Sequence, residues 1–168
     1  MSRPVLLTPP TDLPVSATEC KDHAVVDHDA DDLLIETYIR AATDHLDGLR
    51  GVLSRCIMSQ TWAVEVDKSP FVSGIPDVSA VSVDGIDPAD VTIKPVAVGT
   101  SIEFPGASLP AKVNITAGFG NASDVPWGLK VAIMQMVRRM YDDRAGVEDA
   151  AQGQMMEALI VQYRWAQV

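Results

Sequence analysis

The chain has 168 residues, of which 47% are hydrophobic and 21% are charged, and its formal net charge is −10 at pH 7. This length and composition predict one soluble globular domain over residues 1–168, with a core large enough to fold alone. The acidic charge argues against a nucleic-acid-binding protein, because binding to phosphates needs clustered Lys and Arg. No apolar run approaches the roughly 18 residues of a membrane helix.

The first 14 residues, MSRPVLLTPPTDLP, contain four prolines and are predicted to form an extended arm. Its apolar segment ends at once in Pro9 and Pro10, so no secretory signal is predicted. Ser16 is followed three residues later by Glu19, which is the spacing of a capping box. This spacing predicts a short helix from Ala17 to Val25.

A second helix is predicted from an apolar stripe that begins at Ile35. Apolar residues recur there with alternating spacings of four and three, which is the period of a helix that faces a core. Gly48 and Gly51 weaken the last turns, so the pattern leaves the end of this helix open. The stripe consists of Ile35, Ile39, Ala42, Leu46, Leu49 and Leu53.

The segment DHDADDLLIE, residues 27–36, crowds carboxylates before this helix. As a calcium loop it fails, because Asp32 stands where glycine is needed and Tyr38 where the final Glu is needed. The better interpretation is a helix start, with Asp29 as the cap and Asp31 and Asp32 in the first turn, where the helix dipole favours negative charge. The alternative is a metal-dependent hydrolase that uses Asp27, His28, Asp29, Asp31 and Asp32.

Between Thr61 and Ala117 the chain favours a small antiparallel sheet. Its segments are short and rich in β-branched residues, and pairs such as Asp84-Gly85 and Pro105-Gly106 mark turns between them. No helical stretch separates the strands, which excludes βαβ units. The predicted strands are residues 61–66, 78–83, 91–93, 101–104 and 112–117.

Helical spacing returns after Pro126, with Ser123 or Asp124 as the predicted cap. Lys130 is expected on the polar face of this helix. Gly146 and Gly153 are predicted to bracket a loop, and a last helix runs from about Gln154 to Ala166. The apolar face of the third helix is predicted to contain Leu129, Ile133, Met136, Val137 and Met140.

These elements predict an α+β fold, a small bundle of about four helices with the antiparallel sheet inserted between helices 2 and 3. The helical part would comprise residues 15–57 and 122–168, and the sheet part residues 58–121. The order of elements contains no internal repeat.

No catalytic motif or cofactor site is recognisable, so the sequence predicts a protein that is not an enzyme. Cys20 and Cys56 belong to no CxxC motif and are expected to be buried free thiols. His23 and His45 lack a third ligand at zinc spacing. The turn GFGNAS lacks the third glycine of a dinucleotide motif and the Lys of a phosphate loop. A ligand- or peptide-binding module has little support, because aromatic residues are few.

The C-terminal end, QYRWAQV, favours an interaction surface, because aromatic residues and Arg are enriched at binding hot spots. An equally good interpretation is that Tyr163 and Trp165 close the protein's own core. The candidate surface at this end consists of Tyr163, Arg164 and Trp165.

Three strings in the right order resemble the head–tail connector, or adaptor, proteins of long-tailed phages and gene-transfer agents. They are VDHDADDLLIETYIRAATDHL (26–46), SRCIMSQTW (54–62) and ITAGFGNASDVPWGLKVAIMQMV (115–137), followed by Tyr141 and Arg144. The family pattern has an acidic helix start, a G-R-x-x-x-x-Q-T-W-like entry to the sheet, and an A-G-[YF]-G turn before a V-P-x-x-[LI]-[KR] helix. Here Ser54 replaces the glycine before Arg55.

The resemblance implies a structural virion protein located at the head–tail junction, and in the host cytoplasm during assembly. It implies that the protein binds the portal, forms a ring of usually twelve subunits, extends the DNA channel and offers a platform for a tail or head-completion (stopper) protein. In relatives the C-terminal segment commonly contacts the portal, which points here to Met155, Leu159, Tyr163, Arg164 and Trp165. DNA would pass through the channel without sequence-specific binding, and no membrane is involved.

Overall fold

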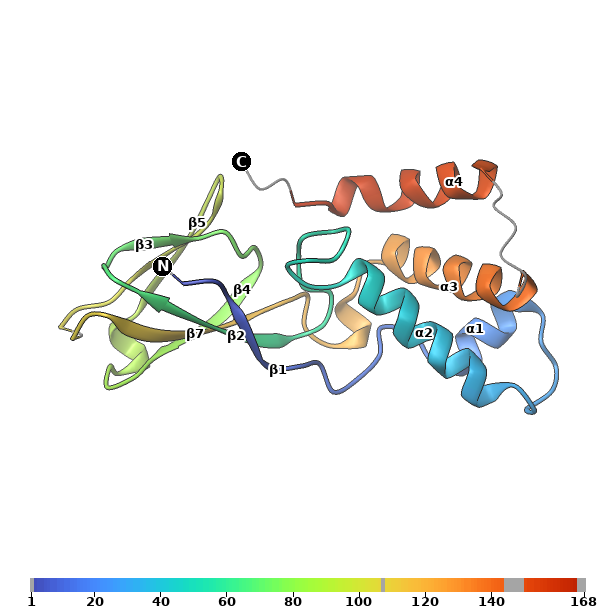
Figure 1. Ribbon diagram of the computed structural model, residues 1–168, viewed down its shortest axis with the longest axis horizontal. Helices are drawn as coiled ribbons and strands as arrows, with labels where there is room; N and C mark the ends of the chain where they lie inside the picture. Colours follow the sequence, from blue (N-terminus) through green and yellow to red (C-terminus); the bar gives the residue numbers. More distant parts are fainter. Residues whose placement is uncertain (1, 107, 144–149, 166–168) are drawn as a thin grey trace.

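The computed structural model describes residues 2–106, 108–143 and 150–165. Within these ranges the chain forms four α-helices, seven β-strands and three short 3-10 helices. The molecule is elongated, with the strands at one end and the helices at the other (Figure 1). The predicted α+β class is confirmed. No helix in the described ranges is long and apolar enough to cross a membrane.

Helix α1 (Ala17–Ala24) begins as predicted. The Ser16 hydroxyl accepts from the Glu19 N–H at 3.2 Å, and the Glu19 carboxylate accepts from the Ser16 N–H at 2.7 Å. These reciprocal bonds satisfy backbone donors that the helix itself leaves unpaired. The helix ends at Ala24, and the next residue, Val25, adopts the left-handed conformation.

Helix α2 (Asp32–Leu46) is shorter than its apolar stripe predicts. Asp47 is extended and Gly48 has φ +79°, so the helix stops before Leu49. The chain then folds back, and the Leu53 N–H donates to the Leu46 carbonyl at 3.2 Å. Leu53 is therefore buried as predicted, although it is not helical.

Helix α3 (Trp127–Asp142) starts directly after Pro126, and no side chain caps it. The predicted cap is wrong, because the Asp124 carboxylate instead accepts from the Asn121 N–H at 3.0 Å and closes the 3-10 turn η2 (Ala122–Asp124). Lys130, predicted on the polar face, is only 7% exposed.

Helix α4 (Ala150–Ile160) lies along α3 and is followed by the 3-10 turn η3 (Val161–Tyr163) (Figure 1). The predicted last helix therefore starts too late and continues too far, because the chain tightens into η3 after Ile160. Gly153, predicted to close a loop, lies within α4. Gly146, Arg144 and Ala166 fall outside the described residues.

The strands form two antiparallel sheets rather than the one predicted. The first has the order β1-β2-β7-β4 and the second the order β3-β6-β5. The prediction missed β1 and β3, and β1 precedes α1, so the first sheet is not wholly inserted between α2 and α3. The strands are β1 (Val5–Thr8), β2 (Gln60–Val66), β3 (Phe71–Ser73), β4 (Val78–Val83), β5 (Thr92–Val96), β6 (Gly99–Glu103) and β7 (Ala111–Ala117). The 3-10 turn η1 (Pro88–Asp90) lies between β4 and β5.

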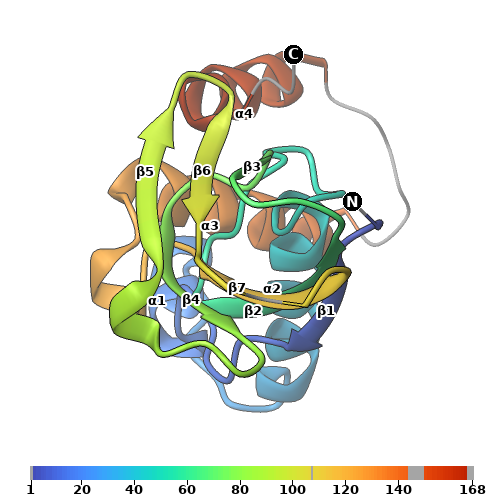
Figure 2. The ribbon, with the colours of Figure 1, turned by 90° about the vertical axis from the view of Figure 1, so that its left-hand side faces the viewer.

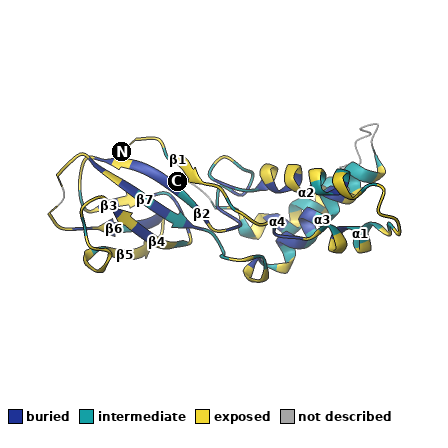
Figure 3. Cartoon of the chain, turned by 90° about the horizontal axis from the view of Figure 1, so that it is seen from below, coloured by how far each residue is buried: buried dark blue, intermediate teal, exposed yellow. Residues whose placement is uncertain are grey.

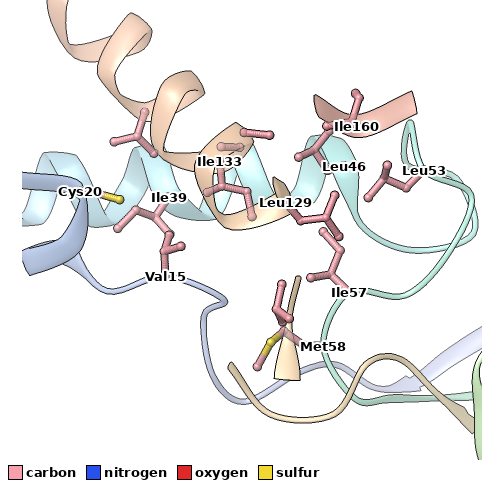
Figure 4. Packing of buried hydrophobic residues seen from close by; sticks show 14 of the residues in the cluster. Val15, Cys20, Ile39, Leu46, Leu53, Ile57, Met58, Leu129, Ile133 and Ile160 are labelled. Carbon is pink, nitrogen blue, oxygen red and sulfur yellow. The ribbon is translucent and has the colours of Figure 1, made fainter. Parts of the chain in front are cut away.

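Two hydrophobic clusters hold these parts together. The helical cluster joins α1, α2 and α3 to the segment that enters β2, through residues such as Ile39, Ile57 and Ile133 (Figure 4). The sheet cluster lies between the two sheets and includes Trp62, Phe104 and Ile115. Figure 3 shows buried positions along β2 and β7, whereas β1 is exposed.

Candidate assembly surface

The acidic segment before α2 forms ion pairs with a lysine. The Lys21 ammonium lies 2.6 Å from an Asp29 oxygen and 2.7 Å from an Asp32 oxygen, and its hydrogen bond to Asp29 lowers the pKa of that carboxyl. The predicted cap at Asp29 is wrong, because Asp31 occupies the cap position without a side-chain cap bond, and the carboxylate of Asp29 turns to Lys21 instead. Asp32 lies in the first turn, as predicted.

This arrangement favours a structural role over a metal site. The ammonium of Lys21 supplies the positive charge between two of the candidate ligands, and it ties α1 to the start of α2. Asp31 accepts a hydrogen bond from the Tyr141 hydroxyl at 2.7 Å, which fastens the same start to the end of α3. Among the described residues, no three metal-ligating side chains converge.

The thiols of Cys20 and Cys56 are free and buried. Burial raises the pKa of each to about 12. Thiols that are almost fully protonated and shielded from solvent are poor nucleophiles. Neither cysteine therefore offers a reactive group.

The C-terminal segment is anchored to the body of the protein, which supports the core-closing interpretation for two of its five candidate residues. A Cβ on Gly128 would lie 3.0 Å from the ring of Tyr163, so that ring packs against the first turn of α3. The backbone N–H of Trp165 donates to the Leu53 carbonyl at 2.8 Å.

The other three candidates differ in exposure. Met155 is 57% exposed, whereas Leu159 packs partly against the helical cluster. The Arg164 guanidinium pairs with Glu157 through contacts of 2.5 and 2.9 Å. The structure thus divides the predicted surface into an anchored end and an exposed helical face.

Arg55 connects this anchored end to the sheet part. Its guanidinium pairs with Asp77 through two nitrogens, lies 4.7 Å from the centre of the Phe119 ring, and donates to the Tyr163 carbonyl at 3.1 Å. The side chain of Arg55 is only 14% exposed. Two of the strings that carry the resemblance, 54–62 and 115–137, therefore meet at this residue.

Methionines line a cavity of about 140 Å³ between α3 and α4. Methionine is flexible and polarisable, so such a lining adapts easily to different partners. The exposed face of Met155 continues this apolar lining onto the surface. The cavity is bordered by Gln135, Met136, Arg139, Met140, Met155 and Met156.

Sequence reasoning missed two exposed apolar features. Trp127 is 72% exposed, and the Lys130 ammonium lies 4.7 Å from its ring centre. In β1, Val5, Leu6 and Leu7 are 61%, 42% and 46% exposed. For β1 the sequence did offer an indication, since three consecutive aliphatic residues lie in an arm that is too short to bury them.

Comparison with protein-family models gives no match, and comparison with curated proteins gives none either. Solved structures do match. A chain in the neck of an empty gene transfer agent (GTA) particle, computed with C6 symmetry, is 19% identical with a TM-score of 0.73, over 99% of this chain and 97% of that one. A chain in the virion of a native GTA particle is 22% identical with a TM-score of 0.72, over 99% and 97%.

A chain in the neck of a native GTA particle, computed with C12 symmetry, is 25% identical with a TM-score of 0.69, over 100% of this chain and 97% of that one. The similarity thus covers the helical and the sheet part together. The resemblance to the connector proteins of gene-transfer agents, predicted from the three strings, is confirmed in the fold.

Proposed function

We propose that this chain is a structural component of the neck of a phage-like gene-transfer particle, a head–tail connector that assembles as a ring. The observation that carries the proposal is the match, over 99% to 100% of this chain, to chains in GTA necks and virions. Two of those necks were computed with cyclic symmetry, C6 and C12, which is the symmetry of a ring. Such a protein would lie in the particle at the head–tail junction.

We infer further that the ring binds the portal through the exposed face of α4. Met155 is 57% exposed on this helix and borders the methionine-lined cavity, and Val161, in the η3 turn that follows, is 55% exposed. Tyr163 and Trp165 serve this contact indirectly, since their contacts with Gly128 and Leu53 fix the segment on the body. Methionine is enriched at protein interfaces relative to the rest of the protein surface.

The ring would extend the DNA channel and present a platform for the next tail or stopper component. The net charge of −10 supports passage of DNA without adhesion, because an acidic wall repels phosphates. The ion-paired carboxylates near Lys21 and the inert thiols support a role without catalysis.

Each contact between neighbouring subunits can be weak if the portal holds many copies at once. We therefore expect a monomer or weak oligomer alone and a ring of about twelve copies on the portal. Size-exclusion chromatography with light scattering, with and without portal rings of the same particle, measures both states. Failure of the wild-type protein to bind portal rings would overturn the proposed function.

A matched pair of substitutions locates the portal contact. Met155→Glu should weaken binding to portal rings at least about tenfold, because it places a charge in an apolar contact. Leu33→Glu is the control, since Leu33 is 78% exposed but lies in α2. Equal binding of the two variants to portal rings would contradict a portal contact on α4.

A further inference from the structure

The four-stranded sheet has two open edges on opposite sides of the molecule. Its order places β1 at one edge and β4 at the other, with β2 and β7 between them (Figure 2). Within the described residues, neither edge strand pairs with a further strand. Open edges present unpaired N–H and C=O groups, which can pair with another chain.

These two edges carry an irregularity at Leu6–Thr8 in β1 and at Val78–Ala80 in β4, which leaves Val5–Leu6 and Val81–Val83 regular. Edge strands are commonly blocked by charged residues, proline or short length. In the second sheet, β5 carries Lys94 and Pro95, and β3 has only three residues. In contrast, β4 reads VSAVSV and β1 reads VLLT, with no charge or proline inside either strand, although Arg3 and Pro4 directly precede β1.

We propose that β1 of one copy pairs with β4 of the next copy, so that the sheets join around the ring. This inference rests on the proposed function, since cyclic symmetry requires two different faces of the subunit to meet. The direction of the strands permits it. All pairs in the four-stranded sheet are antiparallel, so β1 and β4 run in opposite directions, and a head-to-tail contact is again antiparallel.

The backbone of β4 identifies which residues face outward. The Asp84 N–H donates to the Lys112 carbonyl, so the backbone N–H and C=O groups of Asp84 point toward β7. Backbone hydrogen bonding alternates along an antiparallel strand. The N–H and C=O groups of Val83 and Val81 therefore point away from β7. The Val83 carbonyl agrees with this, since it accepts from the Ile86 N–H rather than from β7.

The backbone of β1 also alternates between groups that face β2 and groups that face outward. The Glu65 carbonyl in β2 accepts from the Ser2 N–H, and the Glu65 N–H donates to the Ser2 hydroxyl. The backbone groups of Glu65 therefore face the N-terminal arm. By the same alternation the backbone N–H and C=O groups of Ala63 also face β1. Those of its partner Val5 point back toward β2. Leu6 therefore directs its N–H and carbonyl outward, where they can bond Val81 of the neighbouring copy.

This register brings three further pairs into agreement. Arg3 comes to lie opposite Asp84, and both are exposed residues of opposite charge. Pro4, which has no N–H, comes to lie opposite Val83, whose carbonyl is already bonded. Val5 comes to lie opposite Ser82.

The register also continues a row of the existing sheet. Val5 pairs with Ala63, Ala63 with Asn114, and Asn114 with Ser82. Pairing Ser82 with Val5 of the next copy repeats this row from copy to copy without stagger. A head-to-tail contact of this kind closes into a ring when the rotation from copy to copy adds up to a full turn.

Paired cysteines test the contact. Within one copy Val5 and Ser82 are three strand spacings apart, about 14 Å, which exceeds the roughly 7 Å that a disulfide can span. Facing residues of paired strands lie about 4.5–5.5 Å apart. On portal-bound rings under mild oxidation, V5C/S82C should give a ladder of linked chains on a non-reducing gel.

Each single variant should stop at the dimer, and V5C/K94C, which places the second cysteine on the protected edge, should give no ladder. Val5 is 61% exposed and Ser82 is also exposed, so the variant should fold with an unchanged melting temperature. Portal-bound rings of V5C/S82C that yield no species beyond the dimer would overturn the β1–β4 contact and leave the proposed function intact. Absence of wild-type rings on the portal would instead overturn the proposed function.

A charge swap provides a second measurement. Arg3→Glu and Asp84→Arg should each raise the concentration needed for half-maximal ring assembly, by about threefold or more. The double variant should restore it, because the opposite charges face each other again. Additive losses in the double variant would contradict the register.

Discussion

Cys20 and Cys56 are each 1% exposed, and burial raises the pKa of both thiols from near 9 to about 12. A pKa of about 12 lowers the thiolate fraction at pH 8 about a thousandfold relative to a pKa near 9, and only the thiolate is reactive. We therefore expect both thiols to react with a disulfide reagent at least about tenfold more slowly in the folded protein than in guanidinium, because the lower thiolate fraction outweighs the higher nucleophilicity of a thiolate of high pKa. A fast-reacting thiol in the native protein would contradict this.

Ser54 adopts φ +52°, a conformation that favours glycine. Ser54→Gly should raise the free energy of unfolding by about 0.5–1 kcal/mol, measured by denaturant titration, because it removes the strain of the left-handed backbone. Ser59→Gly is the matched control, since Ser59 has no positive φ and glycine there should only increase the entropy of the unfolded chain. A loss of stability in both variants would count against strain at Ser54.

Individual side chains were the least predictable level of this structure. Lys130 occupies a polar position of the α3 pattern, yet its apolar stem packs inward while its ammonium stacks on Trp127. Asp29 stands where a cap is expected, but Lys21, eight residues earlier, draws its carboxylate away. Both outcomes depend on partners that local spacing does not reveal.

The turn between β7 and α3 depends on Gly118. This residue has φ +132°, and a Cβ there would lie 2.3 Å from the Met58 carbonyl oxygen. Gly118→Ala should lower the free energy of unfolding by about 2–4 kcal/mol, because the backbones of two segments would have to separate. Gly74→Ala, which meets nothing within 4 Å, should change it by less than about 0.5 kcal/mol. Similar losses in the two variants would contradict the close approach.

Elements with a regular residue pattern over six or more residues were predictable from the sequence. Elements that form only by pairing with distant segments were not. The apolar stripe of α2 and the strand VSAVSV of β4 were found from their residue patterns. The strand β1 follows from pairing with β2, more than fifty residues later, and β3 has only three residues. For the C-terminal end the sequence left a core-closing and a binding role open, because the contacts that anchor it are to the distant residues Arg55, Leu53 and Gly128.

At the scale of the whole molecule, charge opposes the assembly that we propose. Each copy carries a net charge of −10, so neighbours in a ring repel one another. Salt shortens the range of this repulsion to a Debye length of about 10 Å at 0.1 M. A single exposed pair such as Arg3 with Asp84 is weakened by the same screening, but it contributes at most about 1 kcal/mol.

We therefore expect self-association to strengthen when salt rises from about 50 to about 300 mM, as measured by sedimentation velocity. Lowering the charge should act in the same direction without added salt. Asp22→Asn combined with Asp27→Asn changes the net charge from −10 to −8 at exposed positions away from both sheet edges, and it should promote association at low salt. Weaker association at high salt would show instead that ion pairs between copies outweigh their overall repulsion.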